Sequence, residues 1–261
     1  MTDAAAVLCE VTAGVATVTL NRPESRNRLD ADGMDLLVRH LTACAEDASV
    51  RVVILTGTGS TFCSGADLAA AAAGDEAGFA RSGPAAMVRL LTTLLEQPQP
   101  VIAKVQGHVA GGGNGLVAAC DIAVASSEAL FAFSEVRVGV APAVISVPCL
   151  AVMNRRDAQE LFLTGDRVDA DRVLRAGLIT RVAPPEALDS VVAGYVELLS
   201  AGGPEALRSS KELIRRVPGL SRQEAFDETA VLSARLFASD EAREGLTAFL
   251  EKRPPAWAAP R

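Results

Sequence analysis

Glu135 is the side chain of this sequence whose type and setting are best suited to proton transfer. It follows the apolar and small residues 131–134 and precedes Val136. Burial among apolar neighbours disfavours the charged carboxylate and raises its pKa, which suits a general acid or base near neutral pH. A second interpretation stays open, in which Glu135 is a surface residue or forms an ion pair with the adjacent Arg137.

A run of three glycines, Gly111 to Gly113, precedes Glu135 in the chain. Glycine lets the backbone turn tightly or approach another group closely, so this run is either part of a binding site or merely a tight strand-to-helix turn. Asn114 follows it, but an amide cannot act as a base. The two histidines, His40 and His108, support neither a Ser-His-Asp triad nor a metal cluster, and we expect no metal site.

The composition excludes several classes of protein. With 261 residues, 49% of them hydrophobic, the chain is long enough to build a sizeable core. A net charge of −7 argues against a nucleic-acid partner, because phosphate binding needs clustered Lys and Arg. Polar residues interrupt the apolar runs and no signal peptide is apparent, so we expect a cytoplasmic protein with no membrane segment. The five cysteines are widely spaced and odd in number, which favours buried free thiols.

The elements that must position Glu135 read as strands alternating with helices. We expect a hairpin over residues 4–20 that turns at Ala13-Gly14, and a helix over 31–47 that is capped by Asp30. Further helices are expected near Asp67, over 84–96 and over 112–120. Buried strands are expected in VRVVILTG, VIAKVQG and DIAVAS. This alternation predicts an α/β fold with parallel βαβ units.

The second half of the chain is mainly helical. Helices are expected over 148–163, 170–176, 184–200, 204–216, 221–237 and 239–252, with a strand-like return before residue 182. We therefore divide the chain into an α/β core at 1–195 and a helical C-terminal region at 196–261.

Six segments in this order make the chain similar to the enoyl-CoA hydratase/isomerase family, also called the crotonase family. They are LNRPESRN, FCSGADL, VQGHVAGGGNGLVAACDIAVAS, FSEVRVGVAP, LTGDRVDADRVLRAGLITRV and DEAREGLTAFLEKR. The resemblance implies a spiral of ββα units with a helical trimerisation region, assembled as a homotrimer or as a hexamer of paired trimers. It also implies an acyl-CoA thioester substrate and no metal or redox cofactor, since coenzyme A belongs to the substrate.

The resemblance also implies roles for individual residues. The backbone amides of Ala66 and Gly112 would hold the thioester oxygen as an enolate forms, and Glu135 would transfer the proton. Each amide lies near a helix N-terminus, whose dipole favours negative charge. The remaining substrate-binding positions are Arg22, Arg26, Asp67, Leu68, Ala69, Gly115, Ala143, Phe249 and Lys252. Phe249 and Lys252 would reach the coenzyme A of a neighbouring subunit.

The sequence departs from the family pattern at Gly115, where hydratases commonly have a second glutamate that activates water. It also reads PAVIS at 142–146, where many hydratases have PGxGG, although Ala143 keeps a backbone N–H. Asp67, Asp75 or Glu76 could supply a second acid, but a capping role for Asp67 and solvent exposure for the other two are the simpler interpretations.

Three functions fit this pattern. The first is a hydratase with one glutamate, in which Glu135 serves as both base and acid. Relatives that lack the other glutamate and carry a similar SEVRVG to PAVIS segment resemble hydratases of branched or carboxylated enoyl-CoAs, such as methylglutaconyl-CoA, which favours this function. The second is an enoyl-CoA isomerase, since one base can move a proton between C2 and C4. The third is a non-catalytic acyl-CoA binder.

Overall fold

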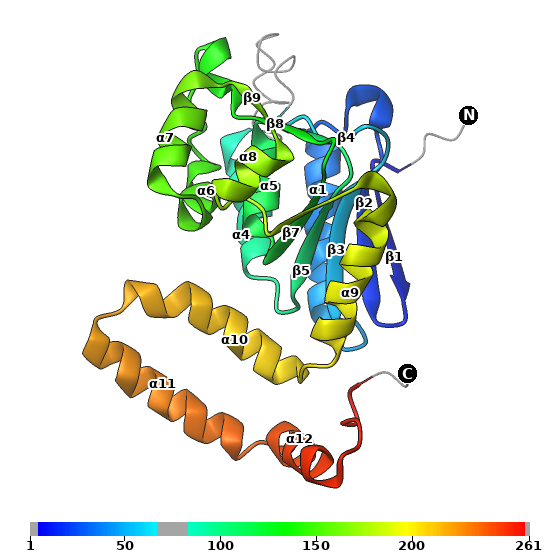
Figure 1. The fold of residues 1–261 in the computed structure, drawn as a ribbon, viewed down its shortest axis with the longest axis vertical. Coiled ribbons are helices and arrows are strands. Elements are labelled where there is room, and N and C mark those ends of the chain that lie inside the picture. The colour runs from blue at the N-terminus through cyan, green and yellow to red at the C-terminus, as the bar shows by residue number, and fades with distance from the viewer. Residues whose placement is uncertain (1–4, 67–82, 259–261) are drawn as a thin grey trace.

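The computed structural model describes residues 5–66 and 83–258, and two β-sheets organise them (Figure 1). The larger sheet is parallel except for its edge strand β1, which pairs with β2 in an antiparallel hairpin. Its strands, in spatial order, are β1 (Val7–Thr12), β2 (Val15–Leu20), β3 (Val52–Gly57), β5 (Val101–Val105), β7 (Ile122–Ser126) and β10 (Arg181–Ala183). The predicted hairpin is confirmed, with both Ala13 and Gly14 at positive φ in its turn.

The smaller sheet contains short strands that run parallel except for the last. In spatial order they are β4 (Thr61–Cys63), β6 (His108–Ala110), β8 (Leu130–Ala132) and β9 (Arg167–Asp169). The strand pairs β3–β4, β5–β6 and β7–β8 each give one strand to each sheet. This repeat is the spiral of ββα units that we expected.

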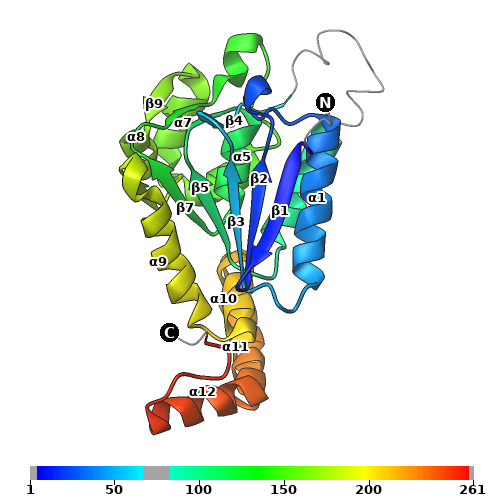
Figure 2. The same ribbon diagram turned by 90° about the vertical axis from the view of Figure 1, so that its right-hand side faces the viewer.

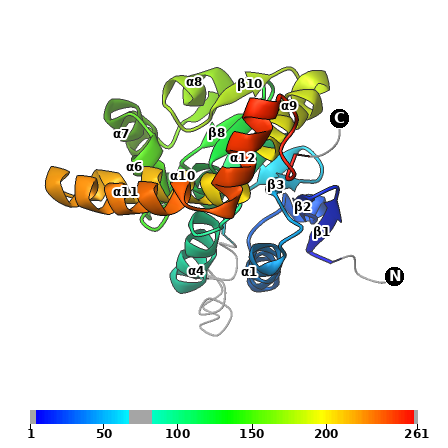
Figure 3. The ribbon, with the colours of Figure 1, turned by 90° about the horizontal axis from the view of Figure 1, so that it is seen from below.

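Helices on both faces of the larger sheet explain why its strands are apolar throughout. Val53 and Leu55 of β3 join the main core under α1 (Ala31–Glu46), α4 (Pro84–Leu95) and α5 (Gly112–Ala119). The alternate residue Val52 faces the opposite side, where α9 (Leu188–Ser200) packs. Viewed from below, α9 lies on one side of the strands while α1 and α4 lie on the other (Figure 3).

Between β8 and α9 the chain forms a set of short elements around the second sheet. They are the 3-10 helix η2 (Ser134–Val138), α6 (Ser146–Val152), α7 (Arg155–Thr164), α8 (Ala170–Arg175) and the 3-10 helix η3 (Pro185–Ala187). The single helix expected over 148–163 is wrong, because the chain breaks at Met153 and Asn154. Asn154 there donates from its backbone N–H to Ala176 and from its side chain to Arg175, which stops α6 before α7 begins.

The C-terminal helices extend away from the sheets as an arm (Figure 2). The arm consists of α10 (Pro204–Arg216), the 3-10 helix η4 (Val217–Gly219), α11 (Arg222–Phe237) and α12 (Asp240–Glu251). These helices match the predicted ranges. The boundary that we placed at residue 195 falls inside α9, which continues to Ser200.

No helix within residues 5–66 and 83–258 has the length and apolar character needed to cross a membrane. All five cysteines are free thiols, and four of them are buried, with Cys9 only partly so.

Candidate active site

The predicted catalytic residues follow three neighbouring parallel strands of the smaller sheet. Ala66 lies just after β4, Gly112 just after β6, and Glu135 shortly after β8. The carboxyl ends of parallel strands meet at one edge of a sheet, and ligands commonly bind at that edge. The strands therefore bring together residues that are up to 69 positions apart in the sequence.

Gly65 allows the amides of Ala66 and Gly112 to lie side by side. Its φ of +89° favours glycine, and a methyl group placed on it would lie 2.8 Å from the Gly112 nitrogen. A methyl group on Gly112 would in turn lie 3.6 Å from the Ala66 nitrogen. Within the described part of the chain, neither N–H is a donor in the backbone hydrogen bonds that join the loops. Two adjacent, unoccupied donors can stabilise an oxygen on which negative charge develops.

Gly112 is also the first residue of α5, so its N–H belongs to the positive end of a helix dipole. All eight residues of α5 are buried, which keeps water away from that helix and strengthens its electrostatic effect. Met87 of α4 packs over the turn, with its terminal methyl carbon 2.8 Å from where a methyl on Gly112 would lie. A side chain at position 112 would therefore require the flexible end of Met87 to move.

Hydrogen bonds between β8 and α5 fix the position of Glu135. The carbonyl of Ala132 accepts from the Gly111 N–H at 3.1 Å and from the Asn114 side chain at 2.9 Å. Glu135 follows three residues later on η2, and its Oε1 lies 3.6 Å from where a methyl on Gly111 would be. The Glu135 carboxyl group thus lies against the residue that precedes Gly112, and the amide of Asn114 is used for scaffolding.

The Glu135 side chain is partly buried. Its Oε2 is buried and has no hydrogen-bond partner among the described residues. Burial raises the pKa of Glu135 above its ordinary value, while a hydrogen bond from its own backbone lowers it to a smaller extent. A raised pKa brings a carboxyl group closer to the range in which a general acid/base works.

Arg137 does not neutralise Glu135. Its guanidinium donates to the carbonyl of Gly165 at 2.9 Å and pairs with Asp166 at 3.3 Å. The interpretation of Glu135 as the ion-pair partner of Arg137 is therefore wrong.

Gly115 and Ala143 lie on the segments that depart from the family pattern. Gly115 is buried, and a methyl group on it would lie 2.6 Å from Cγ2 of Ile145. The Ala143 N–H donates to the carbonyl of Ala141 at 2.7 Å. A substrate that bound the Ala143 amide would have to displace this carbonyl. The contact between Ala143 and substrate stays a prediction.

The loop expected to contact coenzyme A lies beside the loop that carries Ala66. Ser64 donates its N–H to the carbonyl of Arg26 at 3.1 Å, and Leu29 donates to that of Gly65 at 2.8 Å. The side chain of Arg26 is exposed, whereas Arg22 forms an ion pair with Asp30.

Several predicted positions are not brought to this site in the single chain. Phe249 and Lys252 lie on α12 and its C-cap, at the end of the molecule away from β4 and β8 (Figures 1 and 2). The side chain of Phe249 is 80% exposed. The predicted contacts at Asp67, Leu68 and Ala69, the helix start near Asp67, and the alternative acids Asp75 and Glu76 lie outside the described residues.

Sequence reasoning missed three residues that surround the site: Asn27, Met87 and Cys149. Asn27 is buried at positive φ, and its side chain donates to the carbonyls of Thr58 and Thr61, which holds the Arg22–Arg26 loop in place. The Cys149 thiol lies 3.7 Å from the carbonyl of Asn114, and burial and the nearby Glu135 both raise its pKa. Met87 and Cys149 read only as core residues, because nothing local in the sequence marks which helix will cover a distant glycine turn.

Comparisons with known proteins identify the family of the chain. The family model described as enoyl-CoA hydratase/isomerase matches residues 10–260. The enoyl-CoA hydratase EchA19 of Mycobacterium tuberculosis is 34% identical, over 91% of each chain. The (E)-benzylidenesuccinyl-CoA hydratase of Thauera aromatica is 30% identical, over 96% of this chain and 98% of its own. A crystal structure of an enoyl-CoA hydratase from Mycobacterium smegmatis superposes with a TM-score of 0.89 at 34% identity, and the match covers 97% of this chain and 99% of that one.

The fold and the site define an α/β protein of the crotonase fold with a C-terminal helical region. The chain belongs to the enoyl-CoA hydratase/isomerase family.

Proposed function

We propose that the protein is an enoyl-CoA hydratase in which Glu135 is both the general base and the general acid. The observation that carries the proposal is a buried carboxyl oxygen beside the turn that carries the two amides, with neither the oxygen nor the amides bonded to any residue among 5–66 and 83–258 in the contacts found there. Relatives named as hydratases support this reaction over others of the family.

In the proposed reaction, the thioester oxygen of a 2-enoyl-CoA binds the N–H groups of Ala66 and Gly112. Glu135 takes a proton from water as the water oxygen forms a bond to C3, and the C2=C3 electron pair moves to give an enolate on the thioester oxygen. The protonated Glu135 then delivers its proton to C2, and the thioester carbonyl re-forms. Water and the enoyl-CoA are both consumed, and the carboxylate is regenerated.

The protein's own groups carry every step of this proposal, so it needs no metal or redox cofactor. Coenzyme A enters as part of the acyl-CoA substrate. Arg22 and Arg26 are proposed to contact its nucleotide, with the backbone at 66–69 and the Gly115 and Ala143 positions nearer to the pantetheine and acyl group.

Loss of enoyl absorbance on incubation with crotonyl-CoA or 3-methylglutaconyl-CoA tests the proposal. The Glu135→Gln variant keeps the side-chain shape but cannot accept a proton, so we expect turnover to fall by about 10²–10⁴-fold. Wild-type protein that hydrates no 2-enoyl-CoA would contradict the hydratase. A Glu135→Gln variant with an unchanged rate would exclude Glu135 as the acid/base, and one that alters no measurable property would support a non-catalytic acyl-CoA binder.

An enoyl-CoA isomerase is the second candidate, and the contact between Gly115 and Ile145 favours it. Because Ile145 fills the space beside Gly115, the described part of the site contains one carboxylate where a water-activating pair would need two. A single base suffices to take a proton from C2 of a 3-enoyl-CoA and return it to C4. A 3-enoyl-CoA that gains conjugated absorbance without a mass increase would support the isomerase, and a water adduct alone would contradict it.

We also propose that the protein assembles as a homotrimer or as a hexamer of paired trimers through its arm. Among the described residues, α11 buries none of its own, and Phe226, Val231 and Phe237 on it are each at least 67% exposed. A hollow of about 490 Å³ on this arm is lined mainly by apolar residues, including Leu213, Phe226 and Leu236. A large unpartnered apolar surface is typical of a protein interface. The assembly would also bring Phe249 and Lys252 of one subunit toward a neighbouring site, and sedimentation analysis would measure it.

A further inference from the structure

Two helices, α5 and α6, pack against each other, and glycine at position 115 of α5 meets Ile145 at the start of α6. Gly111 is the N-cap of α5, and Gly115 lies four residues later in the first turns of that helix. Glu135 Oε1 lies over the first of these glycines, at 3.6 Å from where a methyl on Gly111 would be. Ile145 lies over the second, with Cγ2 at 2.6 Å and Cβ at 3.0 Å from where a methyl on Gly115 would be.

The Ile145 side chain has little freedom to move away. It is only 4% exposed, and it is branched at Cβ, so the two atoms nearest to Gly115 belong to its stiff part. The next turn of α6 is anchored as well, because Cys149 donates its N–H to the Ile145 carbonyl and its thiol contacts the Asn114 carbonyl. Position 115 therefore accepts glycine and nothing larger while residue 145 is isoleucine.

The geometry points to Ile145 as the residue that sets the number of carboxylates in the site and thereby selects its reaction. Ile145 occupies with hydrocarbon the space that a second acid at position 115 of α5 would need, four residues along the chain from Gly111, which Glu135 lies against. The side-chain volumes at positions 115 and 145 are coupled. Glycine at 115 with isoleucine at 145 leaves one carboxylate in the site, whereas glutamate at 115 with glycine at 145 would place two there. This inference rests on the proposed acyl-CoA chemistry of Glu135, but the packing of the pair can be measured without it.

A thermal-unfolding cycle tests the packing. We compare wild type, Gly115→Ala, Ile145→Gly and the double variant. Alanine normally stabilises a helix relative to glycine, yet Gly115→Ala should lower the unfolding midpoint by roughly 3–10 °C, because the added methyl overlaps Ile145. The double variant should be clearly more stable than the sum of the two single changes. The matched control is Gly194→Ala in α9, where a methyl would meet nothing within 4 Å and should not lower the midpoint.

A Gly115→Ala variant as stable as wild type, or strictly additive changes, would overturn the inference. Such a result would leave the proposed function untouched, because that depends on the separate Glu135→Gln assay. A clear coupling together with a Glu135→Gln variant of unchanged rate would have the opposite meaning, with the packing correct and the proposed function wrong.

Substitutions at positions 115 and 145 also test whether Ile145 determines which reaction the site favours. Gly115→Glu combined with Ile145→Gly should raise the ratio of water addition on crotonyl-CoA to double-bond shift on a 3-enoyl-CoA by at least about tenfold, in the range that one general acid or base contributes. Mass spectrometry of the products separates the two reactions. Ile145→Gly alone is the control, since it opens the space without adding an acid. An unchanged ratio in a folded double variant would overturn the role of Ile145 in selecting the reaction.

Discussion

The α/β core and the C-terminal arm are stabilised in opposite ways. In the core, strands such as β3 and β5 bury most of their side chains, and that packing fixes the positions of the site residues. In the arm, α10 buries only Ser209 and α12 only Ala248 of the residues that the structure describes, and α11 buries none. The core can thus hold a preorganised site within one chain, whereas the arm presents an apolar surface that a single chain does not cover.

Polar contacts attach the arm to the core in place of an apolar interface. Lys211 of α10 reaches Asp121 at 2.7 Å and the carbonyl of Gln99 at 3.3 Å. The Arg51 side chain donates to the carbonyls of Gly202 and Trp257, which ties the last described residues back to the sheet. Such contacts fix the direction of the arm, but they contribute less free energy of folding than apolar burial does.

Gly65→Ala should reduce turnover strongly, because it changes the core at the point where backbone amides are proposed to bind the substrate. The new methyl would lie 2.8 Å from the Gly112 nitrogen at a φ of +89°, so the two amides must move apart. We expect kcat on crotonyl-CoA to fall by about 10²–10³-fold, as for loss of one oxyanion donor. The control is Gly219→Ala in the arm, where a methyl meets nothing within 4 Å and activity should not change. Wild-type kcat in Gly65→Ala would show that these amides do not hold the reacting oxygen.

Phe226→Asp should affect assembly and leave the fold of the single chain intact. The side chain is 67% exposed, so the change removes no contact within the core. In an oligomer formed through the arm it would place a charge in an apolar interface at a cost of several kcal/mol, and the assembly should dissociate at micromolar concentration. Sedimentation velocity would measure this dissociation, with circular dichroism as the check on folding. An oligomer of unchanged size would place the interface elsewhere.

The same contrast explains what the sequence could predict. Long elements with clear patterns were predicted well, including α1 with its Asp30 cap and the three arm helices. The short strands β4, β6 and β8 were missed, because three residues cannot display an alternating pattern. Yet these strands position the site.

The motifs singled out Ala66, Gly112 and Glu135, which the structure places just after these strands, and their catalytic roles stay predictions. The packing of Ile145 against Gly115 and of Met87 against Gly112 depends on contacts between distant segments. No local sequence signal encodes such contacts, so the sequence marked the PAVIS segment as unusual without revealing what its isoleucine does.

Glu135→Gln should increase the stability of the folded protein slightly at high pH, although it lowers activity. Burial raises the pKa of Glu135, so the folded state holds a proton that the unfolded chain has already lost. The stabilisation is complete below the ordinary glutamate pKa, and it is lost as the pH rises through the raised value. The variant should therefore gain stability relative to wild type as the pH rises from 4 to 8, by roughly 1–3 °C in unfolding midpoint. Parallel pH profiles for the two proteins would indicate a solvated carboxylate.

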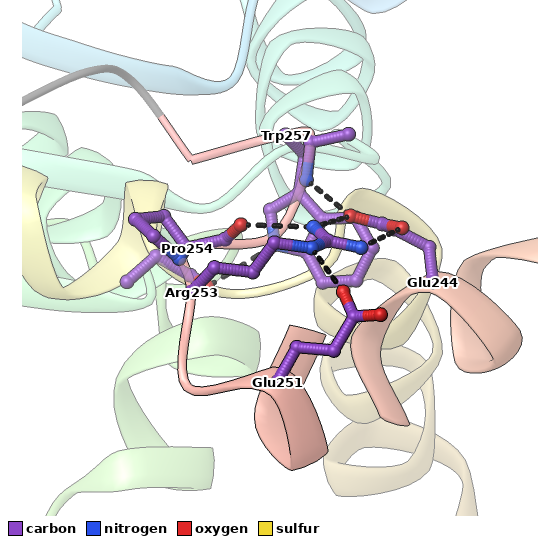
Figure 4. A network of polar contacts seen from close by, with 7 residues as sticks. Glu244, Glu251, Arg253, Pro254 and Trp257 are labelled. Carbon is purple, nitrogen blue, oxygen red and sulfur yellow. Dashed lines mark hydrogen bonds and ion pairs between the residues drawn. The ribbon is translucent and has the colours of Figure 1, made fainter. Parts of the chain in front are cut away.

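The smallest effect is expected at the tip of the arm, where Arg253 binds both carboxylate oxygens of Glu244, at 2.7 and 3.0 Å, and also Glu251 (Figure 4). The Arg253 hydrogen bonds, and then the Ala256 N–H, lower the pKa of Glu244 to about 2. The stabilisation from this network is complete above the ordinary glutamate pKa. It is lost as the pH falls from that pKa through the lowered pKa of about 2. Trp257, the one tryptophan of the chain, lies next to this network and donates its indole N–H to Ala201 at 3.2 Å.

Acid titration of Trp257 fluorescence therefore reports on the docked tail directly. Between pH 5 and 2 the emission should shift to longer wavelength as the tail leaves α12, before the far-ultraviolet circular dichroism of the core changes. Glu244→Gln should show the shifted emission already at neutral pH. Glu251→Gln removes only one contact of Arg253 and should resemble wild type. Simultaneous loss of both signals in wild type would mean that tail and core unfold together, and that the polar contacts of the arm are coupled to the packing of the core.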